Sequence, residues 1–516
     1  MTELLTSAQM RAVEAAAIGS GAVTGLELME RAGRGVVEAM FEEWPELARA
    51  PHRAVVLCGP GNNGGDGFVV ARLLRGWGWK VEVWLFGDPE RLPPDAGANH
   101  DRWRAAGGAV TAWAGAEAGF APGADTALLV DALFGTGLGR PVEGFAGFAR
   151  ATQGTGPRVV AVDIPSGLCA DSGRYLRREG APAEPQIRAD LTVSFHAEKL
   201  GHRLAEGPAA CGRVVVKDIG LRGGAGGAVC LVGPETGQAA AAKAGAHKYT
   251  HGHALVLSGG AGRTGAARLA ARGALRIGAG LVTLGVPGAA QQEVASQIAA
   301  VMLRRVEDGD GLGEVLRDRR FNALCLGPGL GLERARELVR VACGAPEPRA
   351  VVLDADALTA FADDPEALFA VLHARCVLTP HGGEFARLFP DIAERLDAAP
   401  ETGPAFSKVE AARQAAARAG CVVLLKGPDT VIAAPDGRAA ISSAAYGRAV
   451  PWLATAGAGD VLAGFITGLL ARGFTPMAAA ESAAWLHVEC ARSFGPGLIA
   501  EDLTETLPAV LRELRG

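Results

Sequence analysis

The sequence predicts an α/β protein of two domains, each a parallel sheet covered by helices on both faces. At 516 residues the chain is too long for a single hydrophobic core. Short apolar runs alternate with helical segments, which is the pattern of a buried parallel sheet. This alternation stops once, in a stretch rich in glycine and alanine, and then resumes. The fold class is therefore α/β, with two three-layer αβα domains.

The first half supplies strands that are apolar along their whole length. Residues 68–77, after the first glycine loop, predict a helix between the first two strands. Parallel sheets of this kind bind ligands at the carboxyl ends of their strands, so the residues that follow each strand are the ones to inspect. The predicted strands are residues 54–58, 81–86, 128–131, 159–163, 191–195 and 214–219.

A domain boundary is predicted where this rhythm weakens. Residues 222–227 are glycine-rich and residues 237–245 are mostly alanine, as is typical of a connecting segment. We therefore predict domains over residues 1–222 and 246–516, with a linker over 223–245. Beyond the linker we predict strands at residues 254–257, 323–326, 350–354, 376–379 and 422–425, and helices at 459–470, 478–490 and 503–514.

Charge and composition exclude several classes of function. The net charge of −5, from 51 basic and 56 acidic residues, gives no electrostatic footprint for nucleic acid. No uncharged apolar run is long enough to span a membrane, and the N-terminus is interrupted by charges, unlike a signal peptide. The nine cysteines are scattered singly, without a C-x-x-C pair, so neither disulfides nor a zinc site is expected. We expect a cytoplasmic protein.

Two glycine loops match the dinucleotide pattern G-x-G-x-x-G, at residues 59–64 and 260–265. No acidic residue ends the next strand to bind a ribose, since Glu82 lies inside its strand, so an NAD-dependent dehydrogenase is disfavoured. In the first loop, Asn62, Asn63 and Asp66 add oxygen atoms that suit a hard cation or a sugar hydroxyl. A helix N-terminus there also favours an anion such as a pyrophosphate. A capped turn remains the alternative for this loop alone.

Two further strand ends carry an acid followed by glycine. Asp131 precedes a turn that contains Gly135 and Gly137, and Asp163 precedes Ser166 and a further glycine. Because the carboxyl ends of parallel strands meet at one edge of a sheet, we expect these groups to converge with the first glycine loop. Three converging sets favour a polar binding pocket over three separate helix caps.

The second half carries a kinase-like loop at residues 457–460. Its glycines allow helix N-terminal amides to face a phosphate, and Asp460 lies in the first helical turn, where a carboxylate can deprotonate a hydroxyl. Residues 426–430 follow a buried strand, where a nucleotide can lie. His381 and Glu384 follow another strand, and the glycine turn 327–331 follows a third. We interpret His381 as a ligand-contacting residue because of its place at a strand end.

These motifs together resemble a known pairing of families. Residues 61–67, 131–137 and 163–167, with the opening segment 5–33, resemble the NAD(P)H-hydrate epimerase (YjeF N-terminal) domain. Residues 247–249, 327–331, 379–381, 426–430 and 456–460 resemble the NAD(P)H-hydrate dehydratase domain of the ribokinase-like superfamily. The chain departs from the family pattern at Gly382, where proline is frequent, and at residues 250–252. The resemblance implies a Rossmann-like N-terminal domain and a ribokinase-like C-terminal domain.

The resemblance also implies two coupled repair reactions. NADH and NADPH become hydrated at the nicotinamide ring, which gives R and S hydrates (NADHX and NADPHX) that dehydrogenases cannot use. The epimerase half interconverts the two forms. The dehydratase half returns the S form to NAD(P)H, with ADP in bacteria and ATP in eukaryotes. The fused arrangement favours ADP, which would be converted to AMP and phosphate, and the family suggests a homo-oligomer.

Residue roles in the epimerase half follow from the same resemblance. The metal site implied there is potassium, bound by Asn63, Asp131 and Ser166. Asp163 is our candidate for the catalytic acid or base, because its carboxylate follows a strand and faces the reacting ring. The residues expected to hold the pyrophosphate and ribose of the hydrate are Asn62, Asn63, Gly64, Gly65, Asp66, Gly135, Thr136, Gly137, Leu138, Gly139, Arg140 and Pro141.

In the dehydratase half, Asp460 is expected to be the base that activates the ring hydroxyl. The kinase ancestry suggests that the hydroxyl is phosphorylated and then leaves as phosphate, with Mg²⁺ bridging the phosphates of the nucleotide. Ala266, Gly329, His381 and Asp460 are expected to contact the hydrate. The residues expected to bind ADP are Lys426, Gly427, Pro428, Asp429, Thr430 and Gly459.

Two other functions fit parts of the sequence. The loop at residues 457–460 alone would permit a kinase for a sugar or a vitamin precursor. The first half would then be a binding domain without catalytic activity. A test for turnover of NADHX with ADP, against phosphorylation of a stable alcohol by ATP, separates these functions from hydrate repair.

Overall fold

The computed structural model describes residues 2–113, 120, 122–154, 156–180, 184–224, 226–227, 229–243, 245, 247–345 and 347–515. Several positions of the predicted linker and domain bounds (1, 225, 228, 244, 246 and 516) lie outside these residues. The chain forms two compact units. One comprises Glu3–Val229 and Ala398–Ser407, and the other comprises mainly Cys230–Asp397 and Lys408–Gly516.

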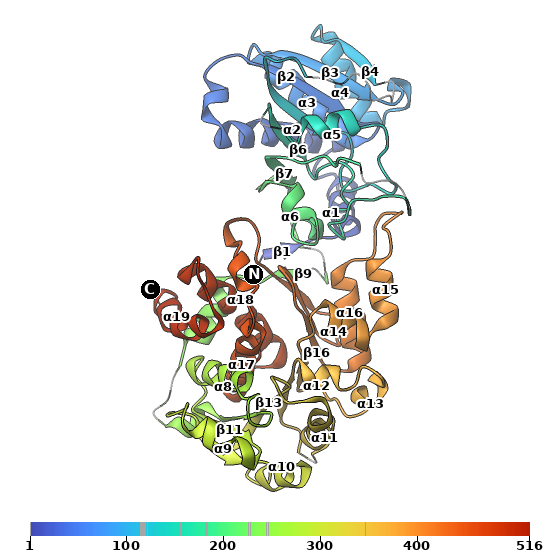
Figure 1. Ribbon diagram of the computed structural model, residues 1–516. Coiled ribbons are helices and arrows are strands. Elements are labelled where there is room, and N and C mark those ends of the chain that lie inside the picture. The colour runs from blue at the N-terminus through green and yellow to red at the C-terminus, as the bar shows by residue number, and fades with distance from the viewer. Residues whose placement is uncertain are drawn as a thin grey trace. The chain divides into compact units, whose positions relative to one another are not determined.

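The N-terminal unit contains a seven-stranded sheet in which every pairing is parallel (Figure 1). Its strand order is β4-β3-β2-β5-β6-β7-β8. The parallel sheet follows from the apolar strands of the sequence, which alternate with helices. The strands are β2 (Arg53–Cys58), β3 (Lys80–Phe86), β4 (Val110–Trp113), β5 (Thr126–Ala132), β6 (Arg158–Val162), β7 (Leu191–Phe195) and β8 (Arg213–Lys217).

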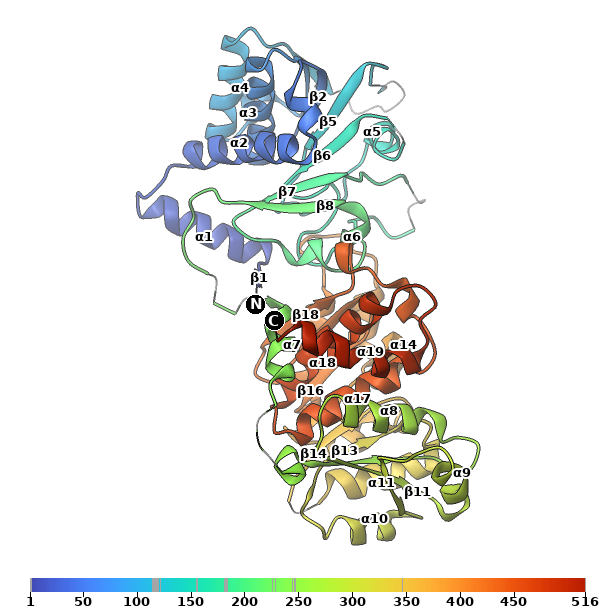
Figure 2. The same ribbon diagram turned by 90° about the vertical axis from the view of Figure 1, so that its left-hand side faces the viewer.

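Helices cover both faces of this sheet. Helices α2 (Gly25–Glu43), α3 (Asn62–Gly76) and α4 (Pro94–Ala105) lie on one face, and α5 (Ala146–Ala151) lies on the other (Figure 2). Alternate residues of one strand accordingly enter different cores. In β2, Val56 and Cys58 join the first core cluster, whereas Val55 and Leu57 join the second. The three-layer prediction is confirmed. Helices α1 (Ser7–Gly19) and α6 (Gly207–Ala210) complete the unit.

The strand order alone predicts where the sheet has a binding crevice. From β2 the chain runs outward through β3 and β4, and then returns to the other side of β2 with β5. The carboxyl ends of β2 and β5 therefore flank the point at which the direction of winding reverses. Ligands of open α/β sheets bind at this point, because the loops on its two sides diverge and leave space between them.

The C-terminal unit contains an eleven-stranded sheet in the order β1-β9-β18-β17-β16-β15-β14-β13-β10-β11-β12. Winding reverses between β10 and β13, so the loops after these strands flank the second crevice. The strands are β1 (Thr2–Leu4), β9 (Val229–Leu231), β10 (His253–Leu257), β11 (Leu281–Val286), β12 (Met302–Arg305), β13 (Phe321–Leu326), β14 (Ala350–Leu353), β15 (Cys376–Leu378), β16 (Val422–Leu425), β17 (Asp429–Ala433) and β18 (Ala439–Ser443).

This second sheet is mixed, which differs from the parallel sheet that we predicted. Strand β17 runs antiparallel to both of its neighbours, β16 and β18. The difference arises because β16 and β17 are joined by the short turn Lys426–Pro428, which is too short to cross over a sheet. The sequence analysis interpreted this turn only as a nucleotide loop and missed the hairpin that it forms.

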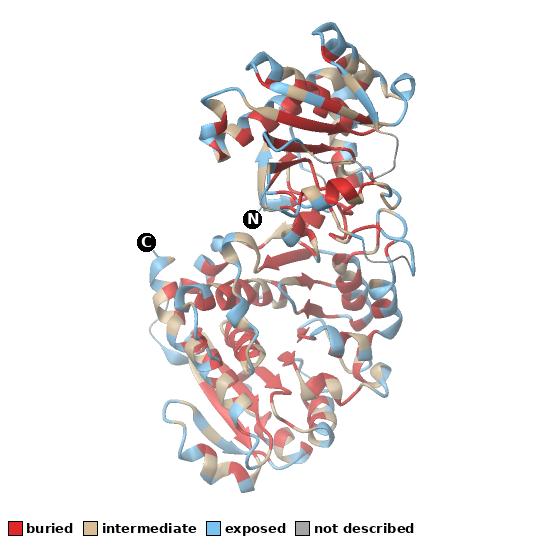
Figure 3. Cartoon of the chain, turned by 45° about the horizontal axis from the view of Figure 1, so that its top comes forward, coloured by how far each residue is buried: buried red, intermediate tan, exposed pale blue. Residues whose placement is uncertain are grey.

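Helices cover both faces of this sheet as well, with the strands buried between them (Figures 1 and 3). Strand residues of alternate facing, such as Val256 and Leu257, are fully buried. One helical layer contains α8 (Gly265–Arg276), α17 (Ala458–Ala471), α18 (Pro476–Phe494) and α19 (Ala500–Glu513). The remaining helices are α9 (Gln291–Ala295), α10 (Gly309–Val315), α11 (Leu332–Cys343), α12 (Asp356–Thr359), α13 (Pro365–Phe369), α14 (Gly382–Leu388), α15 (Pro390–Asp397) and α16 (Lys408–Ala419).

The segment predicted as a linker contains two elements of the C-terminal unit. Strand β9 pairs with β18, and helix α7 (Pro234–Ala241) packs against α18. The small residues that suggested a loose connection serve close packing instead: a Cβ on Gly237 would lie 2.6 Å from the ring of Trp485. Among the described residues, no helix is both long and apolar enough to cross a membrane.

Candidate functional sites

A cavity of about 470 Å³ opens at the carboxyl edge of the N-terminal sheet. The loops after β2, β5 and β6 line it, together with residues of α1 and α2, so it lies at the reversal point of the sheet. Eight of the residues predicted to bind substrate contribute to its wall. They are Asn62, Asn63, Asp66, Gly135, Thr136, Gly137, Leu138 and Asp163.

The other residues predicted to bind substrate do not line this cavity. Gly64 and Gly65 are buried beneath it, where a side chain would collide with the carbonyl of Gly59 or with the sulfur of Met29. Gly139 and Arg140 are exposed. Pro141 lines a different cavity, of about 330 Å³. Gly64 and Gly65 of this loop therefore serve close packing.

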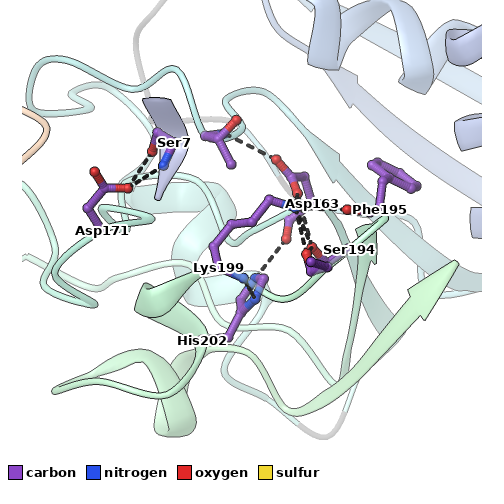
Figure 4. Close-up of polar contacts among 9 residues, drawn as sticks. Ser7, Asp163, Asp171, Ser194, Phe195, Lys199 and His202 are labelled. Atoms are coloured by element: carbon purple, nitrogen blue, oxygen red, sulfur yellow. Dashed lines mark hydrogen bonds and ion pairs between the residues drawn. The ribbon is translucent and has the colours of Figure 1, made fainter. Parts of the chain in front are cut away.

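Asp163 lies at the centre of a buried polar network (Figure 4). Its Oδ1 is 3.1 Å from the ammonium of Lys199 and accepts a hydrogen bond from the Ser194 hydroxyl. Its Oδ2 accepts a hydrogen bond from the N–H of Thr136. His202 donates from Nε2 to the Asp163 carbonyl, because its Nδ1 already accepts the N–H of Lys199. The network fixes the position of the carboxylate in the cavity wall.

Two features single out Asp163 as a chemical group. Burial raises the pKa of its carboxyl, but Lys199, His202 and the hydrogen bond from Thr136 together hold the pKa below its usual value. The side chain is therefore ionised at neutral pH. Its backbone has a φ of +68°, in the left-handed region that residues other than glycine rarely adopt. Such strain is concentrated at functional sites.

The residues predicted to bind potassium are only partly in contact with one another. Asp131 is fully buried and accepts hydrogen bonds from both the N–H and the hydroxyl of Ser166. Burial raises the pKa of Asp131 to about 6, and these hydrogen bonds oppose the rise. Asn63 lies across the turn, with its Oδ1 3.0 Å from the position of a Cβ on Gly135. Its Nδ2 is buried without a hydrogen-bond partner.

This oxygen-rich set fits a large monovalent cation. Asp131 has a carboxylate shielded from water, with no side-chain cation as its hydrogen-bond partner, and a cation would neutralise it. Carboxylate, hydroxyl and amide oxygens are hard ligands. Within the described part of the chain, no group of three or more His, Cys, Asp or Glu side chains is arranged to hold a metal ion.

The sequence analysis missed two groups that face the first cavity or its network. Glu14 on α1 lines the cavity near Arg11. Lys199 is fully buried, and its ammonium lies within hydrogen-bond distance of Ser194 and of the carbonyls of Phe195 and Ala197. A buried lysine has no sequence signature of its own. The signal that could have found it is its place four residues after strand β7.

Asp460 marks the site in the C-terminal unit. It lies in the first turn of α17, just after Gly457, which adopts the left-handed conformation at the N-cap. Burial raises the pKa of Asp460 to about 6, and the nearby Asp354 adds to the rise while Lys426 opposes it. A carboxylate that ionises close to neutral pH is well suited to accept a proton.

The predicted nucleotide loop reaches the same place. The ammonium of Lys426 lies 2.7 Å from Asp354, which also accepts a hydrogen bond from the Thr379 hydroxyl. A Cβ on Gly459 would lie 3.5 Å from the Lys426 ammonium. The turn that follows is closed on itself, since Thr430 exchanges hydrogen bonds with Gly427. The two predicted loops therefore meet.

Asp429, within the same loop, forms an ion pair with Lys408. Lys408 on α16 donates a hydrogen bond of 2.6 Å to its carboxylate and another to the Lys426 carbonyl. Lys408 thereby fixes the start of β17 against the sheet. This contact is structural in character, and it shows how the loop is anchored from α16.

The residues predicted to contact the hydrate have different surroundings. A Cβ on Gly329 would lie 3.6 Å from that of Ala266, so these two residues are neighbours. His381 caps α14: its Nδ1 accepts the N–H of Gly383, and Glu384 accepts the N–H of His381 in return. The imidazole is 56% exposed, and its Nε2 lies 3.5 Å from Oε1 of Glu384. His381 combines the cap with an open face.

Asp354 and Asp356 are further acidic groups here that the sequence analysis did not select. Asp354 is buried, and Asp356 accepts the N–H of Gly331, which ties the turn after β14 to the turn after β13. Ala355 between them has a φ of +45°. Both acids follow a buried strand, so the rule that selected Asp131 and Asp163 applies to them as well.

Comparison with known proteins identifies relatives of both halves. One family model, described as NAD(P)H-hydrate dehydratase, matches residues 254–508, and another, the YjeF-related protein N-terminus, matches residues 25–201. The chain is 36% identical to a bifunctional NAD(P)H-hydrate repair enzyme of Moorella thermoacetica, over 99% of this chain and 97% of that one. It is 52% identical to an NAD(P)H-hydrate epimerase of Rhodobacter capsulatus, over 43% of this chain and 100% of that one.

Among solved structures, an ADP/ATP-dependent NAD(P)H-hydrate dehydratase of Bacillus subtilis, co-crystallised with ATP and Mg²⁺, is 29% identical to the chain. The match has a TM-score of 0.45 and covers 55% of this chain and 99% of that one.

Proposed function

The chain belongs to the family of bifunctional NAD(P)H-hydrate repair enzymes, and from this premise we propose how its residues divide the two reactions. It is an NAD(P)H-hydrate epimerase and an ADP-dependent NAD(P)H-hydrate dehydratase: it interconverts the R and S hydrates and returns the S hydrate to NAD(P)H. We assign epimerisation to the domain of residues 1–222 and dehydration to that of residues 246–516.

In the epimerase domain, the hydrate lies in the cavity with its nicotinamide ring toward Asp163. The ionised carboxylate takes the proton of the hydroxyl group that is bound to the aminal carbon of the substrate. The first turn of α3 offers its N-terminal amides to the pyrophosphate, because a helix N-terminus favours an anion. Asn62, Asn63 and the Gly135–Leu138 turn hold the remainder of the dinucleotide.

Potassium would be held by Asp131, Ser166 and Asn63. Its chemistry there is electrostatic: it would compensate the buried charge of Asp131 and draw the turns after β2, β5 and β6 together. The support for this assignment is the buried carboxylate of Asp131, whose hydrogen bonds among the described residues come only from neutral groups.

In the dehydratase domain, Asp460 takes the proton of the ring hydroxyl as its oxygen attacks the terminal phosphorus of ADP, and the bond to AMP breaks so that AMP leaves. The phosphate then leaves the ring carbon, the neighbouring ring carbon loses a proton, and the ring double bond of NAD(P)H forms. Phosphate leaves more readily than hydroxide because it is the weaker base. Lys426 stands beside Gly459 and supplies positive charge to the nucleotide phosphates. The carboxylates of Asp354 and Asp460 are hard ligands of the kind that suits Mg²⁺, which would neutralise phosphate charge.

The observation that carries this proposal is the meeting of four groups from three separate loops. Asp460, Gly459, Lys426 and Asp354 come from α17, from the turn after β16 and from the end of β14, yet they form one contact set. An acid that ionises near neutral pH beside a lysine and a glycine turn is the apparatus for transferring a phosphoryl group to a hydroxyl.

The test uses the purified full chain with S-NADHX and with ADP, ATP or no nucleotide, and follows the return of NADH absorbance. We expect NADH to be restored with ADP and Mg²⁺, and not without nucleotide. A chain that leaves the hydrate untouched, but phosphorylates a stable small alcohol with ATP, would instead be a kinase.

We further propose, from the family resemblance, that the protein works as a homo-oligomer in the cytoplasm on both NADHX and NADPHX.

A further inference from the structure

The epimerase cavity has more acidic groups than a single base requires. Asp163, Asp66 and Glu14 all line it, and they come from three elements: the end of β6, the first turns of α3, and α1. Three negative charges around one small cavity would repel one another strongly. The neighbours of each carboxylate show how the charge is divided.

Asp163 forms a direct ion pair with Lys199. The Lys199 ammonium lies 3.1 Å from its Oδ1, and both side chains are buried. Lys199 is held in turn by Ser194 and by the carbonyls of Phe195 and Ala197, at 2.8 to 3.1 Å. These neutral acceptors fix the ammonium without competing for its charge. The charge of Lys199 therefore stabilises the Asp163 carboxylate.

Asp66 lies in the opposite situation. Within the described residues, no hydrogen bond or ion pair reaches its carboxyl group, although the residue is largely buried in the cavity wall. Burial raises the pKa of Asp66 well above its usual value, and the charges of Asp163 and Glu14 raise it further. Glu14 is intermediate: burial and Asp163 raise its pKa, but Lys199 and Arg11 oppose the rise.

No basic side chain compensates Asp66 from the elements around it. Helix α1 presents Glu14 and Arg11, with Arg11 beside Glu14, and the end of β2 presents only the neutral thiol of Cys58. The segment after β7 presents Lys199 and His202, which contact Asp163. The N-terminus of α4 presents one more acid, Asp95. The titratable and charged groups that face this cavity or its network are thus Arg11, Glu14, Cys58, Asp66, Asp95, Asp163, Lys199 and His202.

We propose that Asp66 is the second catalytic residue of the epimerase, a proton donor that works opposite the base Asp163, and that Lys199 is the positioning residue that fixes this division. The proposal rests on the epimerase function proposed above. Two carboxyl groups with opposite surroundings are the usual means of running acid and base chemistry in one site.

The proton balance of epimerisation uses both groups. Asp163 takes the proton of the hydroxyl on the aminal carbon, and the oxygen electron pair forms a carbonyl. The bond from that carbon to the ring nitrogen breaks, its electron pair stays on nitrogen, and nitrogen takes the proton of Asp66. After rotation of the opened carbonyl, nitrogen attacks its other face. The nitrogen proton then returns to Asp66, and Asp163 gives its proton to the new hydroxyl.

The experiment measures the pH profile of R-to-S conversion in the full chain. Wild type should give a bell-shaped profile, with a low-pH limb from the base and a high-pH limb from the acid. Asp66→Asn keeps the shape of the side chain but cannot donate its proton, so the rate should fall about 100-fold or more and the high-pH limb should vanish. Lys199→Met should move the low-pH limb upward, so that activity returns as the pH rises.

Matched controls separate this effect from general damage. Asp101→Asn removes an exposed carboxylate of α4, and Lys217→Met removes a lysine of β8 that pairs with Glu42. Both charges lie outside the cavity, so the pH profile should stay unchanged. Dehydration of S-NADHX by each variant reports the integrity of the rest of the chain. Lys199→Arg retains the charge and should keep the low-pH limb in place.

A second readout does not depend on activity. Infrared difference spectra of wild type against Asp66→Asn at neutral pH should contain the carbonyl band of a protonated carboxyl group. This band tests whether Asp66 is protonated even if Lys199→Met fails to fold. Any of three results overturns the proposal. Asp66→Asn could retain the wild-type rate and pH profile, folded Lys199→Met could leave the low-pH limb in place, or the band of the protonated carboxyl group could be absent. If wild type itself does not convert the R hydrate, the epimerase function fails instead.

Discussion

At the scale of single residues, two aspartates of this chain show how surroundings assign chemistry. Asp163 is held ionised by a buried lysine, whereas burial raises the pKa of Asp460 to about 6. Asp163 is charged throughout the neutral range, whereas Asp460 becomes protonated once the pH falls below about 6. Both follow strands or begin helices in the same way in the sequence, and only their neighbours distinguish them.

Asp460→Asn should abolish nucleotide-dependent dehydration. The amide cannot accept the proton of the attacking hydroxyl, so we expect the rate to fall about 100-fold or more. Measuring NADH returned from S-NADHX with ADP gives this rate directly. Conversion of R to S hydrate should persist, because Asp163 lies in the other unit. A variant that dehydrates at the wild-type rate would remove Asp460 from the mechanism.

The pH dependence of dehydration should carry the signature of Asp460. The base works only as a carboxylate, and its pKa is raised to about 6. The rate should therefore be full near pH 7.5 and should fall about tenfold for each pH unit below about 6. Initial rates on S-NADHX across this range, at saturating ADP, measure the limb. A rate that stays flat down to pH 5 contradicts the assignment.

Much of the residue-level site was accessible from the sequence, but its pairings were not. Asp131, Asp163 and Asp460 could be selected because each follows a buried strand or a glycine turn. Lys199 and Asp354 could not be assigned, since their roles depend on partners 36 and 72 residues away, respectively. Only the folded sheets bring such groups within hydrogen-bond distance.

At the scale of elements, the glycine turns are packed as tightly as the cores. In the turn after β2, Gly64 lies against the carbonyl of Gly59, whereas a Cβ on Gly61 would meet nothing within 4 Å. Glycine frequency in the sequence therefore has two origins, ligand approach and close packing. We predicted Gly64 to bind the substrate, and its geometry shows that it also serves close packing.

Gly64→Ala should destabilise the N-terminal unit, because the added methyl group would collide with the Gly59 backbone, which cannot move freely at the end of β2. We expect a loss of about 1–3 kcal/mol in the free energy of unfolding of that unit. Gly61→Ala is the matched control in the same turn and should cost less than about 1 kcal/mol. Urea titration of the full chain measures both. Equal losses would contradict the packing role of Gly64.

The elements themselves followed from the sequence where their patterns were strong. Buried strands such as β7 and β16 coincide with the predicted runs, since uniform apolarity needs no partner to be recognised. The β17–β18 hairpin was missed because polar residues such as Thr430 and Ser442 interrupt its apolar pattern, and β9 was missed because it has only three residues, Val229–Leu231. Their pairing with neighbouring strands, and not their composition, stabilises them.

At the scale of the whole molecule, two sheets offer two separate crevices. In each, the point at which winding reverses carries the predicted glycine loops, between β2 and β5 in one unit and between β10 and β13 in the other. One chain therefore provides an acid–base cavity for exchanging stereoisomers and a phosphoryl-transfer site for removing the hydroxyl. The central claim is that these two activities are carried by different residues and act in sequence on one substrate.

The most direct test of this claim supplies a mixture of R- and S-NADHX, with ADP and Mg²⁺, to wild type and to Asp163→Ala. Wild type should restore all of the NADH, because the R hydrate is converted as the S hydrate is consumed. Asp163→Ala should restore the S fraction at the wild-type rate and then stop, apart from spontaneous epimerisation. If Asp163→Ala consumes the R hydrate faster than the spontaneous rate, the epimerase site is not where this account locates it.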